Sequence, residues 1–107
     1  IAVDGVKLAI ATRSEVVTLI NTPSLASTFP KQPNTYDALY LPRSAYFTGE
    51  LDIHDLAFTR TGLIGENTRF SCIARITEAY SFEPIWKPDF ITSLRPTDQC
   101  HLNGMAL

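Results

Sequence analysis

The feature that most constrains this chain is a two-residue period, punctuated by turn residues, that restarts about halfway along it. In the first half, Lys7–Thr12 puts Leu8 and Ile10 on one face and small alanines on the other, Glu15–Ile20 is rich in valine, leucine and isoleucine, and Asp4-Gly5 before them favours a hairpin turn. In the second half, Ile53–Thr59 and Phe70–Ile76 show the same period. A period of two is typical of β-strands, and no window sustains the 3.6-residue period of a helix. The sequence therefore predicts an all-β fold.

Three further stretches complete the predicted strands. Ala38–Leu41 is apolar and is predicted to stop at Pro42, because proline lacks the N–H that an inner strand needs. Leu63–Asn67 is predicted to be a weaker strand, since a glycine and a glutamate interrupt it. Ser81–Ile91 is extended and holds two prolines, which places it at a sheet edge. The proline-containing stretch Ser24–Thr35 is predicted to be a loop.

An internal repeat groups these strands into two units. Ala2, Ala57 and Ala106 each lie in an apolar stretch, 55 and 49 residues apart. Thr12-Arg13 and Thr68-Arg69 recur 56 residues apart, each between two predicted strands. Four strands in about 50 residues is the size of one β-propeller blade. A β-sandwich also has many short strands, but it does not require a restarting unit.

The repeat predicts a partial β-propeller rather than a complete one. The expected division is one partial domain at 1–107, with a blade at 1–42, a connection at 43–51, a blade at 52–92 and the first strand of a next blade at 101–107. A propeller has about four or more blades, so we expect the chain to be a fragment and the remaining blades to be its partners.

Polar residues gather where the predicted inner strands begin. Asp52 and His54 open the second unit, and His101 and Asn103 open the next one at matching positions. A period of two puts each pair in phase on one side of its strand. Arg69 lies in a turn that antiparallel geometry brings to the same end of the blade. We therefore expect these five residues at the mouth of the propeller channel, in one ligand-binding pocket.

Two chemistries are open for this pocket. Arg13 and Arg69 can clamp a carboxylate or phosphate, which suits a small anionic ligand or a peptide, with His54 or His101 as an acid or base. Alternatively, imidazole, carboxylate and amide groups can hold a divalent metal as cofactor of a hydrolase or lyase. A purely structural role, in which Asp and His close turns by hydrogen bonding, remains a third interpretation.

Charge and hydropathy exclude some partners. The formal net charge is −2 without a basic stripe, so the sequence predicts no nucleic-acid binding. No apolar run approaches the roughly 20 residues of a membrane helix, and we expect a soluble, cytoplasmic protein that does not contact a membrane. Cys72 and Cys100 lack metal-binding spacing and are expected to be reduced, packed thiols.

Three segments carry a resemblance to a known family: Asp52–Ala57, Asn67–Cys72 and Cys100–Ala106. Together they resemble an uncharacterised family of bacterial conserved hypothetical proteins that carry a domain of unknown function. Members of that family are similar to β-propellers and are sometimes fused to tetratricopeptide repeats. The resemblance covers Ile1–Leu107, and the chain departs from the family at Leu63–Glu66, where members are more apolar and aromatic. The family implies a propeller fold and transfers no catalytic residue.

Overall fold

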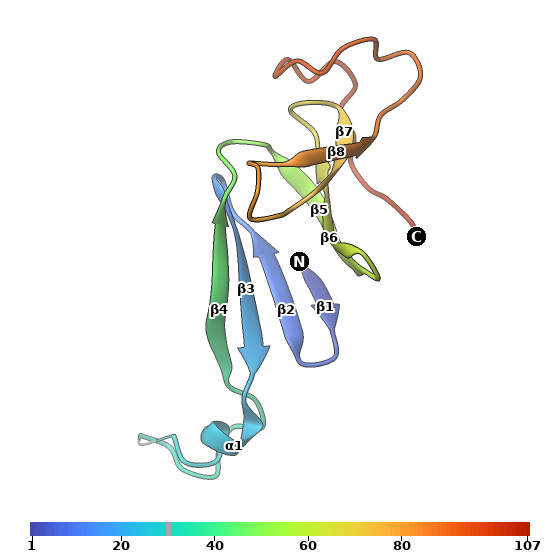
Figure 1. The fold of residues 1–107 in the computed structure, drawn as a ribbon. Helices are drawn as coiled ribbons and strands as arrows, with labels where there is room; N and C mark the ends of the chain where they lie inside the picture. The colour runs from blue at the N-terminus through green and yellow to red at the C-terminus, as the bar shows by residue number, and fades with distance from the viewer. Residues whose placement is uncertain (30) are drawn as a thin grey trace.

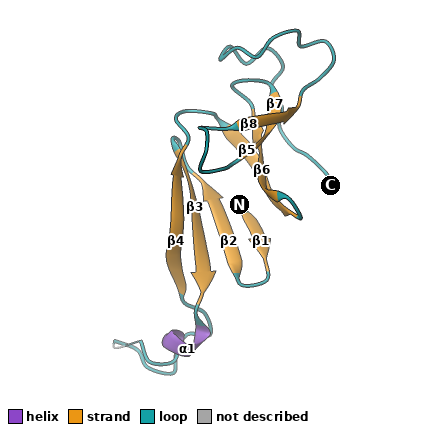
Figure 2. Ribbon diagram, in the orientation of Figure 1, coloured by secondary structure: helices purple, strands orange, loops and turns teal. Residues whose placement is uncertain are grey.

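The computed structural model describes residues 1–29 and 31–107 and contains two four-stranded antiparallel sheets (Figures 1 and 2). The first sheet contains β1 (Ala2–Asp4), β2 (Lys7–Ala11), β3 (Glu15–Asn21) and β4 (Tyr40–Phe47), in that order. The second sheet contains β5 (Ile53–Thr59), β6 (Gly62–Asn67), β7 (Cys72–Arg75) and β8 (Glu83–Trp86), again in that order. The predicted all-β fold is therefore confirmed.

One short helix, α1 (Pro23–Ala26), interrupts the loop between β3 and β4. The sequence predicted this stretch to be loop throughout, and Pro30 within it lies outside the described residues. With only four residues, α1 is far too short to cross a bilayer, and the described part of the chain has no longer apolar helix.

The fourth strand extends further than the sequence predicts. β4 continues through Pro42 to Phe47, so the prediction that the strand stops at Pro42 is wrong. Proline is tolerated here because β4 lies at the edge of the sheet, where an outward N–H needs no partner. Thr18 pairs with Ser44 and Leu19 pairs with Pro42, which leaves Arg43 as a bulge in the edge strand.

The predicted weak strand, β6, is instead the most enclosed strand of the structure. Every residue from Leu63 to Thr68 is buried. A β-carbon at Gly65 would lie 3.2 Å from Leu56 Cδ2 and 3.4 Å from Ile53 Cγ2. Glycine at this position therefore allows β5 and its side chains to pack closely, and it does not interrupt the strand.

The core lies between the two sheets. Residues that pair across antiparallel strands point to the same face, so the register assigns each side chain to a face. The first sheet contributes three alanines to this core along with larger residues, whereas the residues from the second sheet are all large. The buried core residues are Ala2, Ala9, Val16, Leu56, Leu63 and Ile76, with Ala11, Tyr46, Ile53 and Phe58 packed around them.

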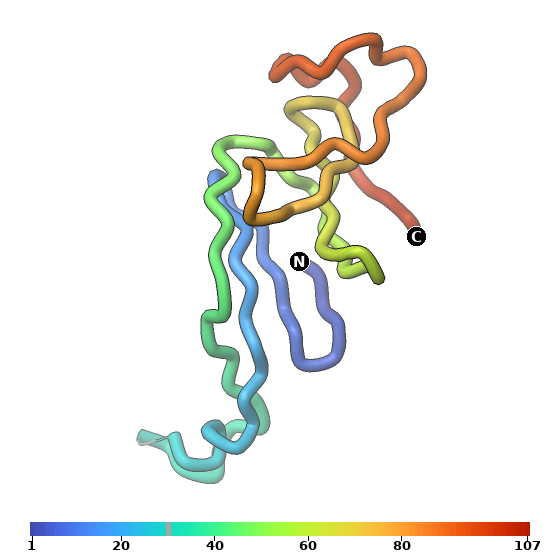
Figure 3. Tube along the Cα trace, in the orientation of Figure 1, coloured from blue at the N-terminus to red at the C-terminus, as the bar shows by residue number. Residues whose placement is uncertain are grey.

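The end of the chain returns to the second sheet without forming a strand, as the trace in Figure 3 shows. We call residues 98–105 the C-terminal segment. The Thr68 hydroxyl donates to the Leu102 carbonyl at 2.7 Å, and the Met105 N–H donates to Asp55 Oδ2 at 3.4 Å. These side-chain contacts replace the backbone pairing of a strand, so the strand expected at 101–107 is not present.

Candidate functional site

A groove of about 690 Å³ lies where the two sheets approach each other. Four parts of the chain contribute charged side chains to it: the β2–β3 turn, the connection before β5, the β6–β7 turn and the start of the C-terminal segment. These residues are Arg13, Arg69, Glu50, Asp52 and Asp98. The groove is therefore strongly polar and carries both signs of charge.

Two arginines in this groove converge on a single carboxylate. Arg13 Nε lies 2.9 Å from Glu50 Oε1, and Arg69 Nη2 lies 3.6 Å from Glu50 Oε2. Both arginines come from the repeated Thr-Arg turns, which the fold does place at one end of the sheets. All three side chains are substantially exposed to solvent, so the contacts are accessible to a ligand.

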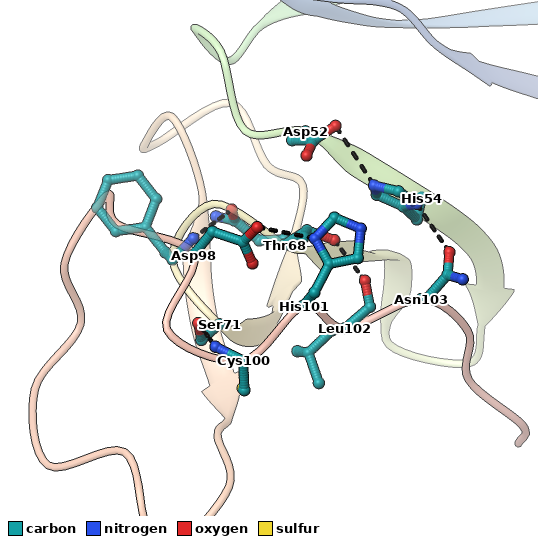
Figure 4. A network of polar contacts seen from close by, with 11 residues as sticks. Asp52, His54, Thr68, Ser71, Asp98, Cys100, His101, Leu102 and Asn103 are labelled. Atoms are coloured by element: carbon teal, nitrogen blue, oxygen red, sulfur yellow. Dashed lines mark hydrogen bonds and ion pairs between the residues drawn. The ribbon is translucent and has the colours of Figure 1, made fainter.

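Two histidine–aspartate pairs stand beside the groove (Figure 4). His54 Nε2 lies 3.4 Å from Asp52 Oδ1, and His101 Nδ1 lies 2.7 Å from Asp98 Oδ2. The two imidazole rings contact each other edge to face, with 4.9 Å between their centroids. Each histidine therefore contacts one of the two aspartates that line the groove.

Asn103 completes this cluster from the C-terminal segment. Its Oδ1 lies 2.8 Å from His54 Nδ1, which carries the hydrogen in this contact because an amide oxygen only accepts. The contact connects the start of β5 to the C-terminal segment. Asn103 therefore fixes the orientation of the His54 ring rather than contacting the groove itself.

Electrostatics distinguish His101 from an ordinary surface histidine. The hydrogen bond to Asp98 and the negative charge of that carboxylate raise the pKa of His101, with smaller contributions from Asp52 and Glu66. The contact with Asp98 therefore favours the protonated form of His101 more than in a free histidine. By contrast, burial raises the pKa of Cys72 to about 11, which leaves an unreactive thiol. Cys72 and Cys100 are both unpaired, as predicted.

The backbone at both groove aspartates is unusual. Asp52 has φ = 54° and Asp98 has φ = 48°, in the left-handed region that residues other than glycine seldom adopt. Aspartate tolerates this conformation better than most residues, but it still has a cost. Two such positions in the lining of one groove favour a role for these carboxylates beyond closing a turn.

The five predicted site residues divide into two groups. Asp52, His54, His101 and Asn103 come together in one cluster, whereas Arg69 lies in the groove with Asp52. The two histidines and Asn103 do not line this groove and reach it only through the aspartates. The grouping of the four polar residues agrees with the alignment of the two strand starts.

Sequence reasoning missed Glu50 and Asp98, the carboxylates that contact Arg13 and His101. Both lie in stretches that read as a connection and a polar loop, where acidic residues are ordinary. The available signal for Asp98 was its position three residues before His101. Nothing in the local sequence singles out Glu50, since its contact with Arg13 spans 37 residues.

Glu66 is the most unusual polar residue of the second sheet. Its side chain is fully buried, and neither carboxylate oxygen has a hydrogen-bond partner among the described residues. It pairs with Ile73 and so lies on the face of the second sheet that points away from the first. In the described part of the chain, no three His, Cys, Asp or Glu side chains are grouped as metal ligands.

The fold defines an all-β protein whose two antiparallel sheets meet at a polar groove. The chain belongs to the family described as a domain of unknown function (DUF4915), whose model matches residues 1–107. The predicted resemblance to a family with such a domain is confirmed at this level. No curated protein and no solved structure matches the chain.

Proposed function

We propose that the groove binds a small molecule that carries both an anionic group and a protonated amine. The observation that carries this proposal is the convergence of Arg13 and Arg69 on the Glu50 carboxylate. Two guanidinium groups from separate turns make a binding site for one carboxylate or phosphate. Glu50 occupies this position as an internal anion, and a ligand anion would compete with it.

The carboxylates of the groove favour a cation. Asp52 and Asp98 both line the groove, and together with Glu50 they outnumber the two arginines. A purely anionic ligand would meet unfavourable charge there, so we extend the expected anionic ligand to one with charges of both signs. His54 and His101 hold the two aspartates in place from behind, as positioning residues.

We also propose that the two sheets are blades of a β-propeller, with this groove at the mouth of its channel. The repeated unit of four antiparallel strands supports this arrangement, as does the contact between the corresponding strands β1 and β5. The two Thr-Arg turns lie at the same end of neighbouring sheets, as adjacent blades require. The channel mouth is a usual place for a ligand in such folds.

Calorimetric titration with three simple probes tests the proposed ligand class. The probes are inorganic phosphate, ethylamine and O-phosphoethanolamine, which carry the anion, the cation and both groups, respectively. We expect O-phosphoethanolamine to bind at least about tenfold more tightly than either single-charge probe, since each added charged contact contributes about 1.4 kcal/mol or more. Equal affinity for all three probes contradicts a site for two charges.

Two variants test the role of the arginines, and they are expected to change phosphate binding in opposite directions. Arg69→Gln removes one cation and should weaken phosphate binding by about tenfold. Glu50→Gln removes the internal competitor and should strengthen it. Arg60→Gln, at the exposed β5–β6 turn, is the matched control and should leave binding unchanged. If Glu50→Gln weakens phosphate binding, the carboxylate does not compete with the ligand and the proposal fails.

A further inference from the structure

The first sheet has an apolar face that no helix or strand of the described chain covers. The register places its members on the side away from the second sheet, and we call them the outer face of the first sheet. They are Val3, Leu8, Ile10, Val17, Leu19, Ala45 and Phe47, with Glu15 as the charged residue among them. Val3 is 65% exposed and Phe47 is 76% exposed. An apolar surface that spans all four strands indicates a missing neighbour.

The repeat identifies the corresponding face of the second sheet. Ala2 and Ala57 occupy equivalent positions, and so do Val3 and Phe58 that follow them. Phe58 lies on the face that packs onto the first sheet, whereas Val3 lies on the uncovered outer face. The same large apolar face is therefore buried in one unit and exposed in the other.

The interface inside the chain shows what such a face packs against. Phe58 and its neighbours rest on the inner face of the first sheet, where Ala2, Ala9 and Ala11 are small and Val16 and Tyr46 are larger. Small side chains let the larger ones of the next sheet approach and fill the space between them. The partner that fits a large apolar face here is a sheet with small side chains.

We propose that the outer face of the first sheet is an interface for a further four-stranded sheet of the same repeat, carried by the same polypeptide. That sheet would present small side chains to Val3, Leu8 and Val17, as the first sheet does to the second. The interface is independent of the groove and of the ligand proposed for it.

A second copy of this chain fits the interface less well. The small inner face of its first sheet is already covered by its own second sheet. The C-terminal segment contacts its second sheet at the start of β5 and just after β6, through His54–Asn103 and Thr68–Leu102. The inner face of the first sheet, which carries the small residues, is therefore not open in a copy, and this favours a sheet from elsewhere in the polypeptide.

Thiol labelling tests this interface directly. The background variant is Cys100→Ser, in which Cys72 remains buried and unreactive. Leu19→Cys places a thiol on the outer face, and Glu78→Cys places a control thiol on an exposed bend. Labelling rates are measured in the chain of 107 residues and in the polypeptide encoded by the complete natural gene, at several protein concentrations.

We expect Leu19→Cys to react at a rate within about tenfold of Glu78→Cys in the isolated chain, and about 100-fold more slowly in the natural polypeptide. This protection should not depend on protein concentration. Protection that grows with concentration identifies a second copy as the partner and overturns the proposal. Fast labelling in the natural polypeptide overturns it as well, because the face is then uncovered. Intact mass and circular dichroism confirm that each variant is folded.

Discussion

The two sheets have the same strand order, but their surroundings differ. The second sheet has the first sheet on one face and the C-terminal segment on part of the other. In the described part of the chain, the first sheet has a neighbouring sheet on one face only. Consequently, all residues from Leu63 to Asn67 in β6 are buried, whereas the first sheet has only Ala2, Ala9 and Val16 as buried members of its described strands.

This difference shows that burial follows the neighbours of a strand more than its composition. Glu66 is fully buried because the second sheet is covered, although a carboxylate is a poor residue to bury. Val3 and Phe47 are exposed because the first sheet is uncovered on that side. The two sheets therefore invert the usual distribution of polar and apolar residues at these positions.

The largest expected effect is the difference in stability loss between two leucine-to-alanine substitutions, one in each sheet. Leu56→Ala removes a side chain that is 4% exposed and lies between the sheets, and it should lower the free energy of unfolding by about 2–5 kcal/mol. Leu19→Ala, on the outer face of the first sheet, should cost less than about 1 kcal/mol in the isolated chain. Urea denaturation followed by circular dichroism measures both.

Equal losses for Leu56→Ala and Leu19→Ala would contradict the comparison, because they would show that the outer face is covered in the isolated chain. Sedimentation at two protein concentrations then distinguishes a self-associated chain from a monomer whose face is covered internally. The expected result, a large difference in a monomer, leaves the contrast between the sheets intact.

A gain in stability is expected when Glu66, the buried acidic residue of the second sheet, is replaced. Glu66→Met keeps a side chain of similar length and removes a carboxyl group whose oxygens have no hydrogen-bond partner among the described residues. A buried unsatisfied polar group costs about 1–3 kcal/mol, so the variant should be more stable by a similar amount. Glu78→Met, on an exposed bend, is the control and should change stability little. A loss of stability in Glu66→Met would show that the carboxylate has a favourable partner.

The sequence predicts the strands well because each sheet forms from local signals. Alternation and turn residues define the β2–β3 and β5–β6 hairpins, and Gly5 has the positive φ of 58° that the β1–β2 turn requires. The same local reasoning fails at Pro42, since only the position of β4 at a sheet edge makes the proline harmless. It also fails at Gly65, whose role depends on Leu56 in the neighbouring strand.

The candidate site is predictable only in part, for a similar reason. The alignment of Asp52–Ala57 with His101–Ala106 puts His54 and Asn103 at matching positions, and this is the sequence signal that grouped them. Glu50 and Asp98 take their roles from contacts with Arg13 and His101 in three dimensions. A single sequence contains no local signal for the first of these contacts.

A moderate effect is expected where the C-terminal segment is attached to the second sheet. Thr68→Val keeps the shape of the side chain and removes the hydroxyl that donates to the Leu102 carbonyl. Loss of this bond should lower the free energy of unfolding by about 1 kcal/mol. Hydrogen exchange should become faster in residues 100–105 and remain unchanged in β2 and β3. Unchanged exchange in the segment would show that other contacts hold it.

The smallest expected effect concerns the titration of His101 in the C-terminal segment. Since Asp98 is the largest cause of its raised pKa, Asp98→Asn should lower the pKa of His101 toward its ordinary value near 6.5. Because the folded-state pKa is raised, the contribution to stability is complete below about pH 6.5 and is lost as the pH rises through the folded-state value. The change in unfolding free energy should be small, since the ring is exposed and screened by solvent. Proton NMR titration of the imidazole measures the pKa directly, with Asp4→Asn in the first sheet as the control. If Asp98→Asn leaves the His101 pKa unchanged, the pair does not form in solution, and the segment covers the second sheet without a titrating contact.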